Sequence, residues 1–377
     1  MNKPLNIGLN LLYMNRKLSG GSITYGINLV NELVQIDQKN NYTIYVNKDC
    51  TDLPIVLGPN FTVVIVPFHN KYVYVRYLWE QLIFPFYLIG KRLDVVHSLG
   101  YVGPIFCWPK HLVSILDLNY KRHAESMSKS KKILLGAMVK VMSRVAKRII
   151  TISNFSKREI SSGLNVNENL IDVTLLSGSN DKTNKEISDF NPKQQYRIVG
   201  DYIIAFGSPS SHKNIMGLLA AFAEVVKSFE NTTLVLVGHQ HNNQELSEEI
   251  ERLDLKGSVL FTGFVPDEHI YPLLKAAKLF IFPSFYEGFG IPLLDAQAVG
   301  VPVVSSNAAS LPEVGGESAV YFDPYQIQEM SQAIISVLDN EDLAKELILK
   351  GTINRQKFSW KNTAVNTLKI YEKYAVS

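Results

Sequence analysis

Short apolar runs alternate along the chain with longer segments whose apolar residues recur at helical spacing. In the first half, amphipathic segments such as 23–36 and 73–89 separate several of these runs. The runs predict strands at 7–12, 42–46, 62–67, 94–97, 112–116, 148–152 and 171–175. Strands that alternate with helices are typical of a parallel sheet covered on both faces.

The alternation lapses over residues 177–201, which are polar and have no periodicity. We interpret this stretch as an interdomain linker, placed at 181–200. Further strands are predicted at 202–206, 233–237, 259–261, 279–282 and 301–305. The sequence therefore predicts an α/β protein with two doubly wound domains, 1–180 and 201–358, followed by a helical segment at 359–377.

Length and composition agree with a globular protein of two domains. The 377 residues are 46% hydrophobic and 19% charged, and the two cysteines lack metal-ligand spacing. The longest apolar run, 82–90, is much shorter than the ~18 residues that a membrane-spanning helix needs. A strand-like segment begins at residue 5, where a signal peptide would have its apolar core. These features predict a cytoplasmic protein.

Positive charge is concentrated in one part of the chain. Twelve Lys or Arg residues lie in the window 110–158 against Asp117 and Glu125, so the window carries +10 and the rest of the chain −7. Within it, residues 131–148 have the pattern of a basic amphipathic helix. Two interpretations stay open: peripheral contact with an anionic membrane, or a helix that packs on the core with a solvated basic face.

The richest motif follows the strand predicted at 279–282. A short loop containing two glycines leads to the proline of a predicted helix: Glu287, Gly288, Phe289, Gly290, Ile291 and Pro292. The glycines allow backbone N–H groups to approach a ligand, and the helix N-terminus favours an anion such as phosphate. Glu287 and Asp295 can both accept hydrogen bonds from hydroxyl groups. This combination predicts a nucleotide-sugar site.

Glu287 and Asp295, eight positions apart in EGFGIPLLDAQAVGVPVV, resemble the acidic pair of the retaining family-4 glycosyltransferases. In that family the first carboxylate lies by the donor sugar and diphosphate, and the second holds the ribose. The family usually has Glu where this chain has Asp295. The resemblance implies the GT-B fold, in which two Rossmann-like domains face a central cleft. It assigns the acceptor to 1–180 and the nucleotide sugar to 201–358, with the last helix crossing back to the first domain.

Two further segments are similar to donor-phosphate motifs of this family. Gly20 and Gly21 follow the first strand, like the family's glycine pair, although an ordinary turn would have the same sequence. Lys213 matches the lysine that neutralises the diphosphate, shortly after Gly207 and Ser208. The arginine that often precedes this lysine is absent, and a plain surface lysine is the alternative.

A third segment resembles the family's nucleobase loop. Gly263, Phe264 and Val265 follow the strand predicted at 259–261. In the family, backbone groups and one apolar side chain hold the base there. A simple helix start would also fit this sequence.

The first domain supplies acceptor-side candidates. His97 and Asp117 each end a predicted strand, and many relatives have His directly before that Asp, where Leu116 stands here. His97 could instead be a core histidine, and Asp117 a helix cap. The stretch around residues 78–98 resembles bacterial mannosyl- and rhamnosyltransferases of surface-polysaccharide assembly.

From the resemblance we predict a retaining, metal-independent hexosyltransferase without a cofactor, whose catalytic candidates are Glu287, Lys213, Asp117 and His97. No Asp-x-Asp triplet is present to bind a metal ion. The expected partners are a nucleoside-diphosphate sugar, a saccharide or polyprenyl-diphosphate-linked oligosaccharide acceptor, and the inner membrane face through residues 110–158; no nucleic acid is expected. The alternatives are a nucleotide-sugar epimerase of the same fold and a non-catalytic accessory subunit.

Overall fold

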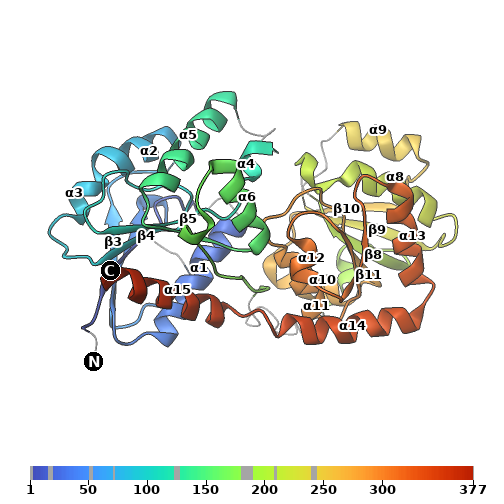
Figure 1. Cartoon of the computed structure of the whole chain (residues 1–377). Helices are drawn as coiled ribbons and strands as arrows, with labels where there is room; N and C mark the ends of the chain where they lie inside the picture. The colour runs from blue at the N-terminus through green and yellow to red at the C-terminus, as the bar shows by residue number, and fades with distance from the viewer. Residues whose placement is uncertain are drawn as a thin grey trace. The chain divides into compact units, whose positions relative to one another are not determined.

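The computed structural model describes residues 3–15, 20–50, 54–70, 73–122, 128–179, 190–207, 210–238 and 244–376 (Figure 1). Tertiary contacts divide the chain into two compact units. The first contains residues 1–176 and 359–377, and the second contains 177–358. Each unit is built around its own parallel sheet.

The first unit has seven strands in the order β3-β2-β1-β4-β5-β6-β7. Their pairings are parallel. The bounds are β1 Asn6–Asn10, β2 Asn41–Asn47, β3 Phe61–Val66, β4 Val95–Ser98, β5 Lys110–Ser114, β6 Arg148–Thr151 and β7 Ile171–Val173. Buried β-branched and leucine side chains on both faces of these strands form the contact with the helices.

The helices of the first unit pack on both faces of this sheet. They are α1 Gly21–Ile36, α2 Val73–Leu82, α3 Phe84–Leu88, α4 Asn119–Arg122, α5 Lys129–Val145, α6 Asn154–Leu164 and α15 Trp360–Val376, with short 3₁₀ turns at Lys48–Cys50 and Glu168–Leu170. The last helix, α15, lies beside α1 and contacts β4 (Figure 1). The chain's final segment therefore completes the unit in which the chain begins.

The second unit has six strands in the order β10-β9-β8-β11-β12-β13, also parallel. They are β8 Asp201–Phe206, β9 Thr232–Val237, β10 Val259–Gly263, β11 Leu279–Phe282, β12 Val303–Ser306 and β13 Ala319–Phe322. The helices are α7 Pro192–Gln195, α8 Ile215–Val225, α9 Gln244–Arg252, α10 Asp267–Lys275, α11 Ile291–Ala298, α12 Leu311–Gly315, α13 Ile327–Leu338 and α14 Glu341–Arg355. A large apolar cluster joins α8 and α13 to the sheet. The edge strand β13 was not predicted.

The described part of the expected linker, residues 190–200, belongs to the second unit, so this part of the linker prediction is wrong. The Phe190 ring lies 4.2 Å from the His269 ring of α10, and the Tyr196 hydroxyl is 2.8 Å from Nδ1 of His269. These aromatic contacts and buried Ile198 attach the segment to the unit. The remaining predicted linker residues up to 189 lie outside the described residues.

Both sheets reverse their strand order beside their first strand, at β1 and β4 in one unit and at β8 and β11 in the other. In doubly wound folds, ligands bind at the carboxyl ends of the strands on either side of such a reversal. The fold therefore provides one candidate position in each unit.

Candidate functional site

An ion pair lies at the strand reversal of the second unit. Lys213 ends the 3₁₀ turn Ser211–Lys213 after β8, and Glu287 lies in the loop after β11. Lys213 Nζ is 2.6 Å from Glu287 Oε1, and these side chains are only 20% and 15% exposed. The Ser284 hydroxyl donates to the same carboxylate oxygen at 2.8 Å. The structure thus brings together the two residues predicted for the diphosphate and the sugar.

Buried serine hydroxyls fix the backbone of the Glu287 loop. Ser310 Oγ is within 2.8 Å of the carbonyl oxygen of Glu287 and 2.7 Å of that of Phe289. Ser306 Oγ donates to the carbonyl oxygen of Ser284 at 2.6 Å. The sequence analysis missed these serines, because only the pairing of β11 with β12 brings them to the loop.

Of the two glycines in this loop, Gly290 is the one that the backbone geometry explains. Gly290 caps α11 with φ of 120°, a conformation that favours glycine. A Cβ atom there would also lie 2.9 Å from the Leu311 side chain. Gly288 and Phe289 are buried, whereas Ile291 is partly exposed at the first position of α11. The loop therefore enters the helix in a fixed geometry, with Pro292 in the first turn.

Asp295 is bound to a residue from the start of the unit. Its Oδ1 accepts the backbone N–H of Ser179 at 2.5 Å, and its Oδ2 accepts the Ser179 hydroxyl at 2.9 Å. Burial raises the pKa of Asp295 to about 6, although both hydrogen bonds act in the opposite direction. Its role toward a ribose stays a prediction, and no sequence pattern predicted the contact with Ser179.

The other residues predicted to bind the donor lie at the ends of β8 and β10, the two strands that flank β9. Gly207 donates its N–H to Val237 at 2.8 Å, and Gly263, with φ of 68°, accepts from Gly238 at 3.1 Å. Phe264 is 70% exposed while Val265 is buried, so the phenyl ring is the apolar group at the surface of this loop. Ser208 lies outside the described residues.

In the first unit, Gly20 and Gly21 begin α1 after the β1 strand and its loop. Gly20 is the N-cap, with φ of 152°. A Cβ atom added at either glycine would have no neighbour within 4 Å, so packing does not explain the pair. Positive φ accounts for Gly20 alone.

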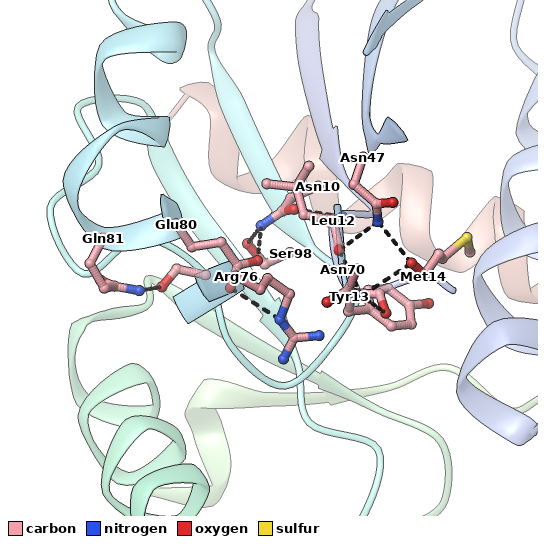
Figure 2. A network of polar contacts seen from close by, with 11 residues as sticks. Asn10, Leu12, Tyr13, Met14, Asn47, Asn70, Arg76, Glu80, Gln81 and Ser98 are labelled. Carbon is pink, nitrogen blue, oxygen red and sulfur yellow. Dashed lines mark hydrogen bonds and ion pairs between the residues drawn. The ribbon is translucent and has the colours of Figure 1, made fainter. Parts of the chain in front are cut away.

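Two asparagines hold the loop between β1 and α1 (Figure 2). The Asn47 amide donates to the carbonyl oxygens of Leu12 at 3.0 Å and Met14 at 2.8 Å. The Asn70 amide donates to Tyr13 at 3.0 Å and Met14 at 3.2 Å. These contacts fix the chain that leads toward Gly20.

A buried polar network occupies the strand reversal of the first unit (Figure 2). Asn10, at the end of β1, donates to Ser98 Oγ at 3.1 Å and to Glu80 Oε1 at 3.3 Å. Arg76 Nε lies 3.7 Å from Glu80 Oε2, and both side chains are buried. Burial raises the pKa of Glu80 to about 7, while the Arg76 charge opposes that rise. Sequence periodicity predicted the helix of Arg76 and Glu80 but not this inward network.

The catalytic prediction for His97 is wrong in this structure. The side chain is fully buried on β4, with Nδ1 2.7 Å from the Tyr371 hydroxyl and Nε2 2.8 Å from Ser114 Oγ. Burial lowers its pKa to about 3, so the ring is neutral at pH 7. With both nitrogens engaged in the core, His97 attaches α15 to the sheet.

Asp117 follows β5 and is partly exposed. Its Oδ1 accepts the Tyr101 hydroxyl at 2.9 Å and the Asn119 N–H at 3.1 Å. The second contact is an Asx turn directly before α4, and the helix-cap alternative for Asp117 stays a prediction as well. A role for Asp117 toward the acceptor stays a prediction.

The described ranges of the chain contain no group of three or more His, Cys, Asp or Glu side chains that could hold a metal ion. None of the helices there has both the length and the apolar character to span a bilayer.

Comparison with known proteins gives the family of the second unit. Residues 189–352 match the family model for Glycosyl transferases group 1. These residues form a glycosyltransferase group 1 domain. The domain includes Lys213, Glu287 and Asp295, so the glycosyltransferase resemblance of the sequence is confirmed.

This chain is similar to O-antigen chain mannosyltransferase B of Escherichia coli. The two are 34% identical over 231 residues, which is 60% of this chain. The match spans 61% of that mannosyltransferase.

Solved structures extend the similarity to the whole chain. Sucrose-phosphate synthase from Thermosynechococcus elongatus superposes with a TM-score of 0.76 at 18% identity, covering 99% of this chain and all of that one. HepE of Anabaena, solved in complex with UDP-glucose, gives 0.69 at 17% identity and covers 98% and 100%. At these identities the similarity establishes the fold, and the predicted GT-B class is confirmed.

Proposed function

We propose that the protein is a retaining, metal-independent hexosyltransferase that transfers mannose from a nucleoside-diphosphate sugar to a growing, lipid-linked bacterial surface polysaccharide. The observation that carries this proposal is the sheltered Lys213–Glu287 pair at the strand reversal of the group 1 domain. The related O-antigen chain mannosyltransferase supports the choice of mannose and of a polysaccharide. The match covers part of each protein, so substrate and acceptor belong to the proposal.

In this mechanism Lys213 and the backbone N–H groups around Gly288 and Gly290 bind the diphosphate. The α11 N-terminus adds its partial positive charge. A diphosphate that attracts Lys213 releases Glu287 to hold the hydroxyls of the sugar. The bond from the anomeric carbon to the phosphate oxygen breaks, and the acceptor oxygen bonds to that carbon on the same face. The departing phosphate oxygen takes the acceptor proton.

The remaining assignments follow the two units. The HepE complex with UDP-glucose supports a nucleoside-diphosphate sugar as donor. From the family resemblance we assign Asp295 to the ribose and Gly263 to Val265 to the base. The first unit binds the saccharide or polyprenyl-linked acceptor, with Asp117 as its candidate contact. The basic region 110–158 holds the protein at the inner face of the cell membrane.

The proposal is tested by a thermal-shift screen against ADP, GDP, UDP and dTDP and their hexose conjugates. A donor at 100 times its dissociation constant should stabilise the fold by ~2.7 kcal/mol. The stabilising donor is then incubated with acceptor in EDTA, and the anomeric configuration of the product is read by NMR. Retained configuration in EDTA is expected. Donor binding without turnover would favour the accessory subunit, and a changed sugar formed without acceptor would favour the epimerase.

A further inference from the structure

Helix α2 buries its charged residues together with Tyr77 and Trp79 and exposes an apolar side. Arg76 and Glu80 are the only charged residues in 73–90, and both are buried against the sheet. Figure 2 shows Glu80 directed toward Asn10 and Ser98. A surface helix in water normally places its charged residues outward. The outer face of α2 is therefore adapted to surroundings other than water.

The exposed side chains of α2 and its neighbours are large and apolar. Trp108 is 95% exposed and Phe106 is 81% exposed, in the loop before β5. Trp108 lines a pocket with Leu88 and Ile89, so this loop lies against α3. We call the following exposed residues the apolar surface: Leu78, Leu82, Phe86, Ile89, Phe106 and Trp108. Single exposed apolar residues are ordinary, but a contiguous group of this kind marks a binding surface.

A basic helix lies next to the apolar surface. Five Lys or Arg residues and no acidic residue lie in α5. The Tyr74 hydroxyl at the start of α2 is 3.1 Å from Ser130 Oγ at the start of α5, and Tyr77 packs in one cluster with Leu134 and Met138. Figure 1 draws α2, α3 and α5 on the same side of the first sheet. Lys91 and Arg92 add exposed positive charge at the end of α3.

We propose that α2, α3 and the Phe106–Trp108 loop insert into the interfacial layer of an anionic phospholipid bilayer, while α5 binds its headgroups. Trp and Tyr side chains favour this interfacial layer, and each basic residue near an anionic surface adds attraction. This combination fits a bilayer better than a protein partner, because the basic face requires an extended anionic surface. The inference deepens the membrane contact in the proposed function. It depends on that function only for the identity of the acceptor.

Tryptophan fluorescence offers a direct test, because Trp79 and Trp360 are buried and Trp108 is exposed. The full-length protein is mixed with vesicles of phosphatidylglycerol and phosphatidylcholine in equal parts, with or without bromine on the acyl chains. We expect a blue shift and bromine quenching of the emission, both absent in Trp108→Phe. Phe106→Ser should reduce vesicle partitioning by about tenfold, as expected for loss of one inserted aromatic side chain.

Matched variants separate insertion from charge and from loss of fold. Leu349→Ser removes an exposed leucine of the second unit and should bind like the wild type. Lys131→Glu and Lys140→Glu on α5 should weaken binding, but Lys361→Glu on α15 should not. Vesicle binding is measured without sugar transfer, so it can succeed or fail independently of the proposed activity. Unquenched Trp108, equal binding to neutral vesicles, or self-association that is abolished by Phe106→Ser would overturn the proposal.

Discussion

Lys213, in the turn after β8, and Glu287, in the loop after β11, neutralise each other in a sheltered ion pair. Lys213→Ala should lower kcat/KM by about two to three orders of magnitude, ~2.7–4 kcal/mol, because the diphosphate loses its ammonium partner.

Glu287→Gln should lower kcat at least about a hundredfold with a smaller change in donor affinity. Steady-state kinetics tests both. Lys227→Ala, in an exposed pair with Glu224, is the control. An effect of Lys213→Ala on kcat/KM below about fivefold would remove this lysine from the site.

Asp295 should give the proposed donor site a pH dependence. Burial raises its pKa to about 6, so the carboxylate takes up a proton as the pH falls through that value. A ribose contact that needs the charge should then weaken, by ~1.5–3 kcal/mol once protonation is complete. Calorimetric donor titrations from about pH 7.5 to about pH 5, a range that includes that pKa, should show the loss in the wild type and a flat profile in Asp295→Asn. Parallel profiles for the two proteins would assign Asp295 to Ser179 alone.

His97 should make folding sensitive to acid. Its folded pKa of about 3 lies below the ordinary histidine value of 6.5, so between these values the unfolded chain binds a proton that the folded chain excludes. Stability should therefore decrease as the pH falls below 6.5, by up to ~1.4 kcal/mol per pH unit for this group. Denaturant unfolding of His97→Gln should show a shallower decrease than the wild type. A His97→Gln slope equal to that of the wild type would contradict this account.

The sequence could predict site residues only where they lie close to one another along the chain. Glu287, Gly290 and Asp295 lie in one strand-loop-helix segment, and their local order indicated a phosphate site. The partners Ser310 and Ser179 come from distant segments, so no spacing rule could identify them. The sequence around a histidine at a strand end is the same whether its side chain faces a ligand or the core. For His97, only the packing of α15 against β4 shows that the side chain lies in the core.

The loop between β1 and α1 depends on amides from other elements. Asn47 is fully buried and satisfies two carbonyl oxygens of this loop, so Asn47→Ala should lower the free energy of unfolding by ~1–3 kcal/mol. Asn47→Asp should be at least as damaging, because it replaces the amide donor by an anion facing those oxygens. Chemical denaturation measures both variants. Asn31→Ala, which loses only its exposed contacts with Pro54 and Val56, should change stability by less than about 0.5 kcal/mol. A fully stable Asn47→Ala would show that the loop holds its shape unaided.

Apolar periodicity located most elements but could not orient them. The apolar runs of β9 and β11 predicted strands. Strand β13 is as short as β11 but lies directly between the polar residues Ser318 and Asp323, and it was missed. The pattern of α2 predicted a helix. The same apolar periodicity would fit a helix whose Arg76 and Glu80 face water. Only the buried network, in which Asn10 donates to both Glu80 and Ser98, shows that Glu80 faces inward.

At the scale of the molecule, the first unit is built from both ends of the chain, which makes its stability depend on the last helix. In α15, Tyr371 is fully buried and bonded to His97, and Trp360 and Ile370 are also buried. A chain ending at Phe358 loses these contacts and leaves the covered face of α1 and β4 open. We expect this truncation to destabilise the first unit by about 5 kcal/mol or more, from the burial of three large side chains.

The second unit should keep its stability in the truncated protein, because residues 177–358 contain its whole sheet and its apolar cluster. Hydrogen exchange read by mass spectrometry distinguishes the two: protection should fall in β1, β4 and α1 and remain in β8, β9 and α8. Tyr371→Phe keeps the helix and removes one hydroxyl, so it should cost only ~1–3 kcal/mol, within the first unit. If truncation lowered protection equally in both units, they would unfold as one cooperative body. If protection did not change, α15 would be dispensable and the first unit complete without the end of the chain.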